Sequence, residues 1–157
     1  MNYVLKSGKL CRSGEVAAQI TGTPFGPEKQ IVVDRRVWTT DIRNAGGRRY
    51  LLLDASGSTV GFAVPECAPG EDPDPLCRMP KIDRARLNLH GAEYELVMES
   101  PQRYVLLSED AAIVHITHRG LSGGWDIAAP AALSPADLCA LFAFSRYIEK
   151  ENEYLFV

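Results

Sequence analysis

Arginine gathers in two short stretches of this sequence, and the chemistry that it suggests is the binding of anions. Residues 34–49 hold five arginines against two aspartates, and residues 78–86 hold four cationic side chains against one aspartate. A guanidinium group can donate two parallel hydrogen bonds to one phosphate or carboxylate group. The candidate anion-binding residues are Arg35, Arg36, Arg43, Arg48, Arg84 and Arg86.

The spacing of these arginines limits which of them can act together. Arg84 and Arg86 share one face of a strand, because side chains two residues apart point the same way. Arg48 and Arg49 are adjacent and point to opposite faces, so at most one of them faces a single ligand. The alternative interpretation is a mixed-charge exterior with scattered ion pairs, each of which stabilises a protein little.

Two histidines, His115 and His118, resemble a metal-ligand pair at first sight. Residues three apart on a strand point to opposite faces, so these two side chains cannot share one metal ion. His90 follows a strand at a turn, where we expect it to be solvated. We therefore expect neither a metal site nor a cofactor.

Cys67 and Cys77 lie within an acidic, proline-rich loop that we expect at residues 65–80. One possibility is that the two cysteines clasp a metal with the carboxylates between them, or close the loop as a disulfide. The other is that they are ordinary thiols on a solvated segment, which the lack of C-x-x-C spacing favours. The prolines predict that this loop contains no central strand.

Composition bounds the class of protein. The chain has 157 residues, 46% of them hydrophobic and 24% charged, which suits one globular domain spanning residues 1–157. Its net charge of −3 argues against general nucleic-acid binding. The sequence shows no P-loop, no G-x-G-x-x-G pattern, no secretory signal and no transmembrane segment, so we expect a non-enzymatic cytoplasmic protein.

The element that organises the chain is a predicted helix at residues 134–151. Ser134 suits the N-cap, Pro135 suits the first helical position, and Asp137 can complete a capping box. Residues 138–144 are seven consecutive apolar residues, which at about 100° per residue cover every face of a helix. A membrane span needs about 20 such residues, so this helix should be surrounded by protein.

Before this helix the sequence reads as short strands separated by turns rich in glycine, proline, asparagine and aspartate. The predicted strands are residues 3–6, 16–21, 30–33, 37–43, 49–54, 59–64, 86–90, 93–99, 103–107, 111–118 and 125–128, with 154–157 as a possible last one. Regular short strands indicate a sandwich or a barrel. A helix that is apolar all round selects the barrel, so we predict a mainly β fold: a closed antiparallel barrel of about 12 strands around a buried C-terminal helix.

Three stretches carry a resemblance to a known family. Residues 50–60 are similar to a strand–Asp-x-x-Gly–strand hairpin, residues 111–127 to a late strand pair, and residues 133–148 to an apolar terminal helix. In these features the chain resembles the tubby C-terminal-like superfamily, which includes the plant LURP-one-related proteins and the phospholipid scramblases. The resemblance implies a closed barrel of about twelve strands wrapped around the helix. It also implies membrane-associated or phosphoinositide-binding roles, but no lipid-binding or calcium-binding motif of the family maps onto particular residues here.

The leading functional hypothesis is a binding or scaffold module whose basic rim recognises an anionic partner, either a phosphate headgroup or an acidic protein. The alternative is a lipocalin-like carrier of a small apolar ligand, in which the terminal helix would lie outside an open barrel. An enzyme acting at the 65–80 loop is a third possibility, and it depends on a reactive Cys67 or Cys77. The sequence also leaves a homo-oligomer open.

Overall fold

The protein forms one closed barrel of twelve strands. The computed structural model describes residues 1–23, 25–67 and 81–152. The strands are β1 (Asn2–Lys6), β2 (Lys9–Arg12), β3 (Glu15–Gly22), β4 (Lys29–Val33), β5 (Arg36–Arg43), β6 (Arg49–Leu53), β7 (Thr59–Cys67), β8 (Ile82–Leu89), β9 (Ala92–Ser100), β10 (Arg103–Ser108), β11 (Ala111–His118) and β12 (Trp125–Ala128). A short 3-10 turn, η1 (Gly120–Ser122), precedes β12, and the helix α1 (Pro135–Glu151) follows it.

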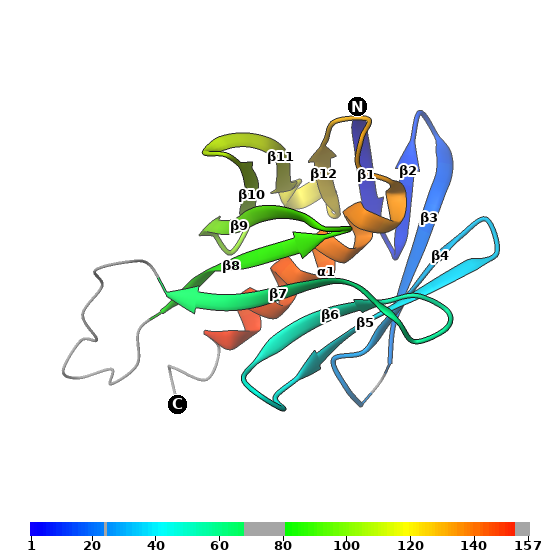
Figure 1. Cartoon of the computed structure of the whole chain (residues 1–157). Helices are drawn as coiled ribbons and strands as arrows, with labels where there is room; N and C mark the ends of the chain where they lie inside the picture. The colour runs from blue at the N-terminus through cyan, green and yellow to red at the C-terminus, as the bar shows by residue number, and fades with distance from the viewer. Residues whose placement is uncertain (24, 68–80, 153–157) are drawn as a thin grey trace.

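Each strand pairs antiparallel with its neighbours in the sequence, and β1 pairs with β12 to close the barrel (Figure 1). The strands alternate as predicted. In β9, for example, Leu96 and Met98 are buried while Glu93 and Glu99 on the opposite face are exposed. Closure gives every strand of this sheet a neighbour on each side. The predicted fold class is therefore confirmed.

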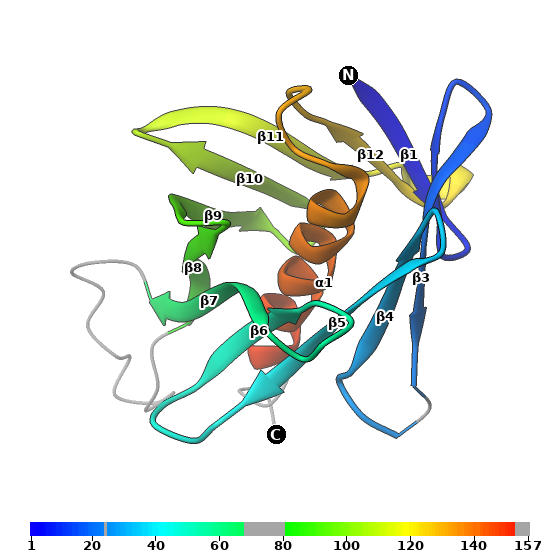
Figure 2. The same cartoon turned by 45° about the vertical axis from the view of Figure 1, so that its right-hand side comes forward.

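Helix α1 lies inside the barrel, as its apolar run predicts, and Figure 2 shows it running through the space that the strands enclose. Ser134 caps it: its hydroxyl accepts the Asp137 N–H at 3.2 Å, and the Asp137 carboxylate accepts the Ser134 N–H at 3.1 Å. Six consecutive residues, from Ala136 to Leu141, are at most 5% exposed. Since six positions span every face of a helix, α1 forms the centre of the core.

Two features of the strands differ from the sequence prediction. The strand β2 was not predicted, and the possible strand at 154–157 lies outside the described residues. Strand β7 continues through Pro65 to Cys67, so the expected loop at 65–80 starts too early. Pro65 is tolerated because the register between β6 and β7 stops at Ala63, so its missing N–H breaks no hydrogen bond with β6.

The turn between β8 and β9 also differs from the prediction. Its central residues are His90 and Gly91, with φ of 51° and 85°, rather than Gly91 and Ala92. Positive φ at both central residues is the requirement of a tight two-residue hairpin turn. The Asn88 side chain supports the turn by accepting the Gly91 N–H at 3.1 Å. As a result His90 leaves the strand and approaches the N-terminal end of α1.

Candidate functional site

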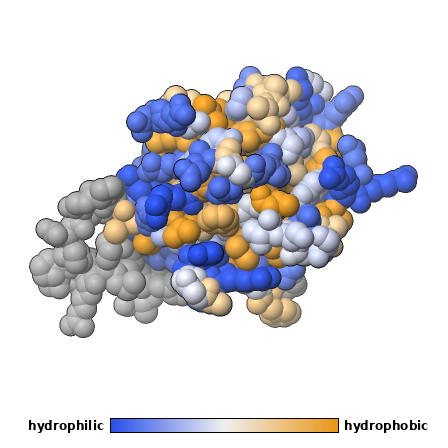
Figure 3. All heavy atoms as spheres, viewed as in Figure 1, coloured by the Kyte–Doolittle hydropathy of each residue, from blue (hydrophilic) through white to orange (hydrophobic). Residues whose placement is uncertain are grey.

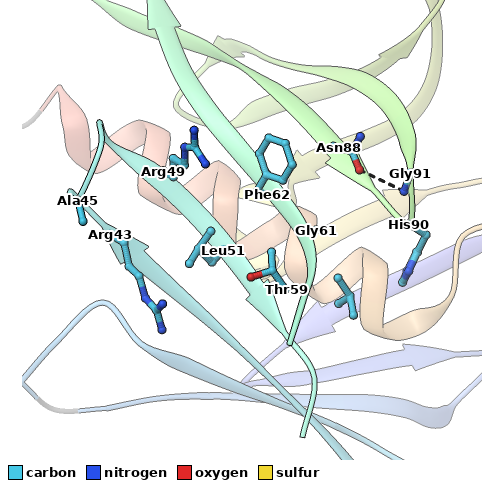
Figure 4. Close-up of a pocket in the computed structure, with 11 residues that line it drawn as sticks. Arg43, Ala45, Arg49, Leu51, Thr59, Gly61, Phe62, Asn88, His90 and Gly91 are labelled. Carbon is cyan, nitrogen blue, oxygen red and sulfur yellow. Dashed lines mark hydrogen bonds between the residues drawn. The ribbon is translucent and has the colours of Figure 1, made fainter. Parts of the chain in front are cut away.

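A pocket opens on the outer wall of the barrel, the face directed away from α1, across strands β5 to β8. Its volume is about 810 Å³. We call it the outer pocket, and Figure 4 shows the side chains that line it. They are Arg43, Ala45, Arg49, Leu51, Thr59, Val60, Gly61, Phe62, Asn88, His90 and Gly91.

Two arginines occupy one end of the outer pocket. Arg43 on β5 and Arg49 on β6 are directly paired across the hairpin. Both are exposed, and among the described residues neither has a carboxylate within ion-pairing distance, although eight such pairs form elsewhere. Like charges directly opposite each other destabilise a strand pair. This end of the pocket therefore carries positive charge that an anion would neutralise.

Asp41 is the acidic residue closest in register to this arginine pair. Asp41 lies two residues before Arg43 and is paired with Leu51. Its chain neighbours, Thr40 and Ile42, face the core, so the Asp41 side chain lies on the outer face. Its Oδ1 atom accepts the N–H of Ile42 at 2.8 Å. The Asp41 carboxylate thus reduces the local positive charge without pairing with either arginine.

Arg49 is oriented by an aromatic neighbour. Its guanidinium carbon lies 5.8 Å from the centre of the Phe62 ring on β7, the geometry of a cation–π contact. Figure 4 shows Arg49 turned toward Phe62 and Arg43 turned away from it, with Leu51 between the two arginines. The arginines therefore flank an apolar floor, and a ligand would meet positive charge on either side of Leu51.

The other end of the outer pocket is polar and contains His90. The His90 Nε2 atom lies 2.8 Å from Oδ1 of Asp137, at the capped end of α1. The His90 side chain is 55% exposed and that of Asp137 is 7% exposed. His90 is thus partly solvated, as expected, but its ring also links the β8–β9 turn to the helix. That contact was not predicted, because it joins residues 47 positions apart.

The two predicted arginines of β8 are already paired with acidic side chains. Arg84 contacts Asp83 at 3.0 Å and Glu95 at 3.1 Å. Arg86 pairs with Glu66, so the two arginines share the outer face of β8, as their spacing predicts, but each has its own counter-ion. Arg84 and Arg86 could bind an external anion only after their ion pairs with these carboxylates break.

Arg48 and Arg49 diverge, as their adjacency predicts. Arg48 contacts the Glu151 carboxylate near the C-terminal end of α1, and the Tyr50 hydroxyl donates to the same carboxylate at 2.9 Å. Burial, and then the negative charge of Glu151, raise the pKa of Tyr50 well above its usual value. Arg48 is therefore held at the helix, and Arg49 is the one that faces the outer pocket.

Arg35 and Arg36 lie far from the outer pocket. Both are at the β4–β5 turn, where Arg35 has a φ of 67° and Arg36 stacks over the Trp38 ring at 5.1 Å. Arg36 and Arg43 are the two ends of the eight-residue strand β5. Seven steps of about 3.3 Å separate these ends by roughly 23 Å. The structure does not bring the six predicted arginines together on one rim. Arg43 is the one among them that lines the outer pocket.

A second cationic group, which the sequence did not single out, surrounds the C-terminal part of α1. It consists of Lys29, Arg146 and Lys150. Burial, and then the charges of Lys150 and Arg146, lower the pKa of Lys29 below its usual value. Arg146 is engaged by Glu149 at 3.3 Å and by the Trp125 ring at 5.3 Å. This group is the main competitor of the outer pocket for an anion.

The other chemically suggestive residues do not assemble into a site. In the described part of the chain, no group of three or more metal-ligating side chains is close enough to hold a metal. Cys11, Cys67 and Cys139 are free thiols, and burial raises the pKa of Cys139 to about 12. Cys77 and the acidic residues 71–74 lie outside the described residues.

Residues 120–124 read G-x-S-x-G, a pattern that in some hydrolases marks a nucleophile. That role requires a sharp turn from a strand into a helix. Here Gly120–Ser122 form η1, and the whole pattern lies in the connection between strands β11 and β12. The nearby His118 uses its Nδ1 atom to accept the N–H of Gly120 at 3.0 Å. No hydrogen bond between the Ser122 hydroxyl and a base is found in the part of the chain that the structure describes, so this pattern indicates no catalytic serine.

Apolar side chains are part of the surface around the outer pocket. Figure 3 shows apolar patches among hydrophilic side chains over the strands β6 to β8. A smaller pocket of about 290 Å³ adjoins the outer pocket through Phe62 and Asn88, and it reaches Arg86 and Tyr94. Phe62 and Asn88 therefore lie at the middle of one continuous indented surface.

Comparison with protein-family models, with curated proteins and with solved structures found no match. Among the described residues no helix is both long and apolar enough to cross a membrane. The geometry of the outer pocket is therefore the observation from which a function can be proposed.

Proposed function

We propose that the protein is a non-enzymatic module that binds an anionic group, a phosphate or a carboxylate, in the outer pocket. The observation that carries this proposal is the cross-strand pair of Arg43 and Arg49, which opens on a pocket of about 810 Å³ and has no ion-paired carboxylate among the described residues. The group recognised belongs to a small molecule, a lipid headgroup or an acidic protein.

Physical chemistry supports this choice of ligand. Two guanidinium groups held on adjacent strands repel each other, and an anion between them converts that repulsion into charge-assisted hydrogen bonds. Other surface arginines of the barrel, such as Arg84 and Arg86, are already neutralised by carboxylates. Arg12, Arg35 and Arg36 also have no ion pair among the described residues, but of these five arginines only Arg43 and Arg49 are directly opposite each other and line a pocket. The Arg43–Arg49 pair is therefore the place where an external anion gains most.

The barrel interior is less suited to ligand binding. Helix α1 occupies it, and the helix side chains Leu138, Leu141 and Phe144 are 0% exposed. The carrier alternative needs an open interior, so the observations favour the outer wall. A barrel around a helix is also the arrangement that the resemblance to the tubby C-terminal-like superfamily implies, and we keep that membership as part of the proposal.

Titration calorimetry with inorganic phosphate at low ionic strength tests the proposal. Arg43→Gln and Arg49→Gln should each weaken binding about threefold to tenfold, because each removes charge-assisted hydrogen bonds at an exposed site. Arg12→Gln is the matched control, since Arg12 is an exposed arginine at the end of β2, outside the pocket. Raising the salt concentration should weaken binding of the wild type.

Two results would contradict the proposal. One is an absence of phosphate binding at any salt concentration. The other is an equal loss of affinity in Arg12→Gln, Arg43→Gln and Arg49→Gln, which would mean that only the net charge of the protein matters.

A further inference from the structure

The floor of the outer pocket is apolar, although it lies on the outside of the barrel. Leu51 on β6 is directly paired with Phe62 on β7. Leu51 is only 8% exposed and Phe62 is half-buried, and neither belongs to the core cluster. Val60, also half-buried, lines the pocket but packs in part against the core. Polar side chains are the usual choice on the solvated face of an antiparallel sheet. Leu51 and Phe62 therefore form an apolar surface next to two arginines that have no ion pair among the described residues.

A hydrogen-bond donor lies beside this floor. Asn88 is directly paired with Phe62 across β7 and β8. Its Oδ1 atom accepts the Gly91 N–H, which fixes the orientation of the amide and leaves the NH₂ group without a hydrogen-bond acceptor among the described residues. Figure 4 shows this amide beside the Phe62 ring, on the side opposite Arg49. The pocket thus combines cations, an apolar floor and one oriented donor.

The size of the pocket and the closure of the barrel favour a small molecule over a peptide. Its volume of about 810 Å³ falls in the range of roughly 300–1,000 Å³ typical of ligand pockets. A peptide that adds a strand to a sheet needs a long free edge. Every strand of the barrel has a neighbour on each side, and the unpaired end of β7 past Ala63 is short and contains Pro65. A peptide here would bind through side chains alone, while its own ordering would still cost free energy.

We infer that the outer pocket takes an amphipathic organic anion: one phosphate or carboxylate group joined to an apolar body of one or two rings. The anionic group pairs with Arg49 and with Arg43, whose exposed side chain must turn from the direction in Figure 4 toward Arg49 to reach it. The apolar body lies on Leu51, Val60 and Phe62, and a polar substituent at its far end accepts from Asn88. This inference rests on the proposed function, since it assumes that the arginine pair binds anions, and it adds the chemical class of the ligand.

The experiment compares inorganic phosphate with 1-naphthyl phosphate in calorimetric titrations of the wild type and two variants. Phe62→Thr removes the ring but keeps a residue that suits a strand. Val32→Thr is the matched control, because Val32 is a solvated strand residue of β4 that is 37% exposed and lies outside the pocket. The wild type should bind 1-naphthyl phosphate about tenfold more tightly than inorganic phosphate, because the rings leave water.

Phe62→Thr should reduce the ratio of the two affinities from about tenfold to about twofold or less, even if loss of the Arg49 contact also weakens inorganic phosphate binding. Val32→Thr should change neither affinity. Phosphate binding that depends on Arg43 and Arg49, without any gain from the naphthyl group, would overturn this inference and leave the proposed function standing. A gain that persists in Phe62→Thr would also overturn it. An equal loss of affinity for both ligands in Phe62→Thr would overturn it as well, because the Phe62 ring would then act only by orienting Arg49. Failure of both ligands to bind would overturn the proposed function as well.

Discussion

At the scale of single residues, Arg49 shows how a site can depend on register. The sequence places it in a basic stretch and predicts that it and its neighbour Arg48 face opposite ways. The structure adds that Arg49 is opposite Arg43 and lies over Phe62. That information comes from the pairing of β5 with β6 and of β6 with β7. Arg49 could have been found by pairing the predicted strands outward from the turn at residues 44–47.

Replacing Asp41 should strengthen anion binding. Asp41 is on the same outer face as Arg43 and contributes the negative charge closest to the pair in register. Asp41→Asn keeps an oxygen that can accept the Ile42 N–H and removes the charge, so we expect phosphate to bind about twofold to threefold more tightly at low salt. Calorimetry would measure this, with Asp110→Asn in the exposed β10–β11 turn as the control. Unchanged or weaker binding in Asp41→Asn would argue against an anion at the arginine pair.

Asp54 should make the stability of the β6–β7 hairpin depend on pH. Its Oδ1 atom accepts the Ser56 N–H, the Ser56 hydroxyl and the Ser58 N–H, at 2.7 to 3.0 Å. These hydrogen bonds, led by that of the Ser56 side chain, lower the pKa of Asp54 below its usual 3.8. A lowered folded-state pKa stabilises the protein above the unfolded pKa, and this stabilisation is lost as the pH falls through the folded-state value.

The corresponding measurement compares melting temperatures of the wild type and Asp54→Ala from about pH 7 to pH 2.5. We expect the wild type to melt higher by a constant amount above about pH 5, and the difference to shrink below pH 3.8 as the carboxylate is protonated. A difference that stays constant down to the lowest pH would show that the charge of Asp54 does not contribute.

At the scale of elements, α1 is the part of the fold that local sequence predicts best. Its cap, its first residue and its apolar run are all written within residues 134–144. The C-terminal end of α1 was harder to predict from the sequence. Asn152 closes the helix and holds the start of β8, since its side chain accepts the Ile82 N–H at 3.0 Å and donates to the Ile82 carbonyl at 2.7 Å. Asn152 and Ile82 are 70 residues apart, so no local sequence pattern predicts these hydrogen bonds.

A charge at the centre of α1 should prevent folding. Leu141 is 0% exposed, so Leu141→Asp places a carboxylate in the core without a partner and should yield no folded protein, whereas Leu141→Ala should cost about 2–5 kcal/mol. Phe142 is half-buried against Trp125, with ring centres 5.5 Å apart, so Phe142→Asp should be less severe. Circular dichroism and urea unfolding would measure this series. A cooperatively folded Leu141→Asp protein would refute the central-helix arrangement.

Asn152→Ala should loosen the attachment of α1 to β8. It leaves the Ile82 N–H and carbonyl without these partners, and we expect a loss of about 1–3 kcal/mol in the free energy of unfolding. Gln102→Ala, at an exposed turn, should change the same quantity by less than about 0.5 kcal/mol. Urea unfolding of the wild type and both variants would measure these changes. If Asn152→Ala were as stable as the wild type, the Asn152 hydrogen bonds would make no net contribution to the free energy of unfolding.

At the scale of the whole molecule, patterning in the sequence was enough for the barrel and its internal helix. Alternating residues fixed most strand positions, and the apolar run of the helix selected closure over a sandwich. The predicted start of the loop at Pro65 was wrong. Proline is excluded from strands that are hydrogen-bonded on both sides, but at Pro65 β7 is no longer paired with β6. The site was less predictable, because charge clusters in a sequence do not show which arginines have counter-ions. Glu66 and Glu151, both distant in sequence, neutralise Arg86 and Arg48.

The measurement that tests the central claim most directly is a ¹H–¹⁵N correlation spectrum of the wild-type protein titrated with inorganic phosphate, because it assumes no site. We predict that the amide signals that shift belong to residues 43–51, 59–62 and 88–91, which surround the outer pocket. Shifts centred instead on Lys29, Arg146 and Lys150, or on Arg84 and Arg86, would place the anion elsewhere. They would contradict the claim that the Arg43–Arg49 pair is the recognition site of this barrel.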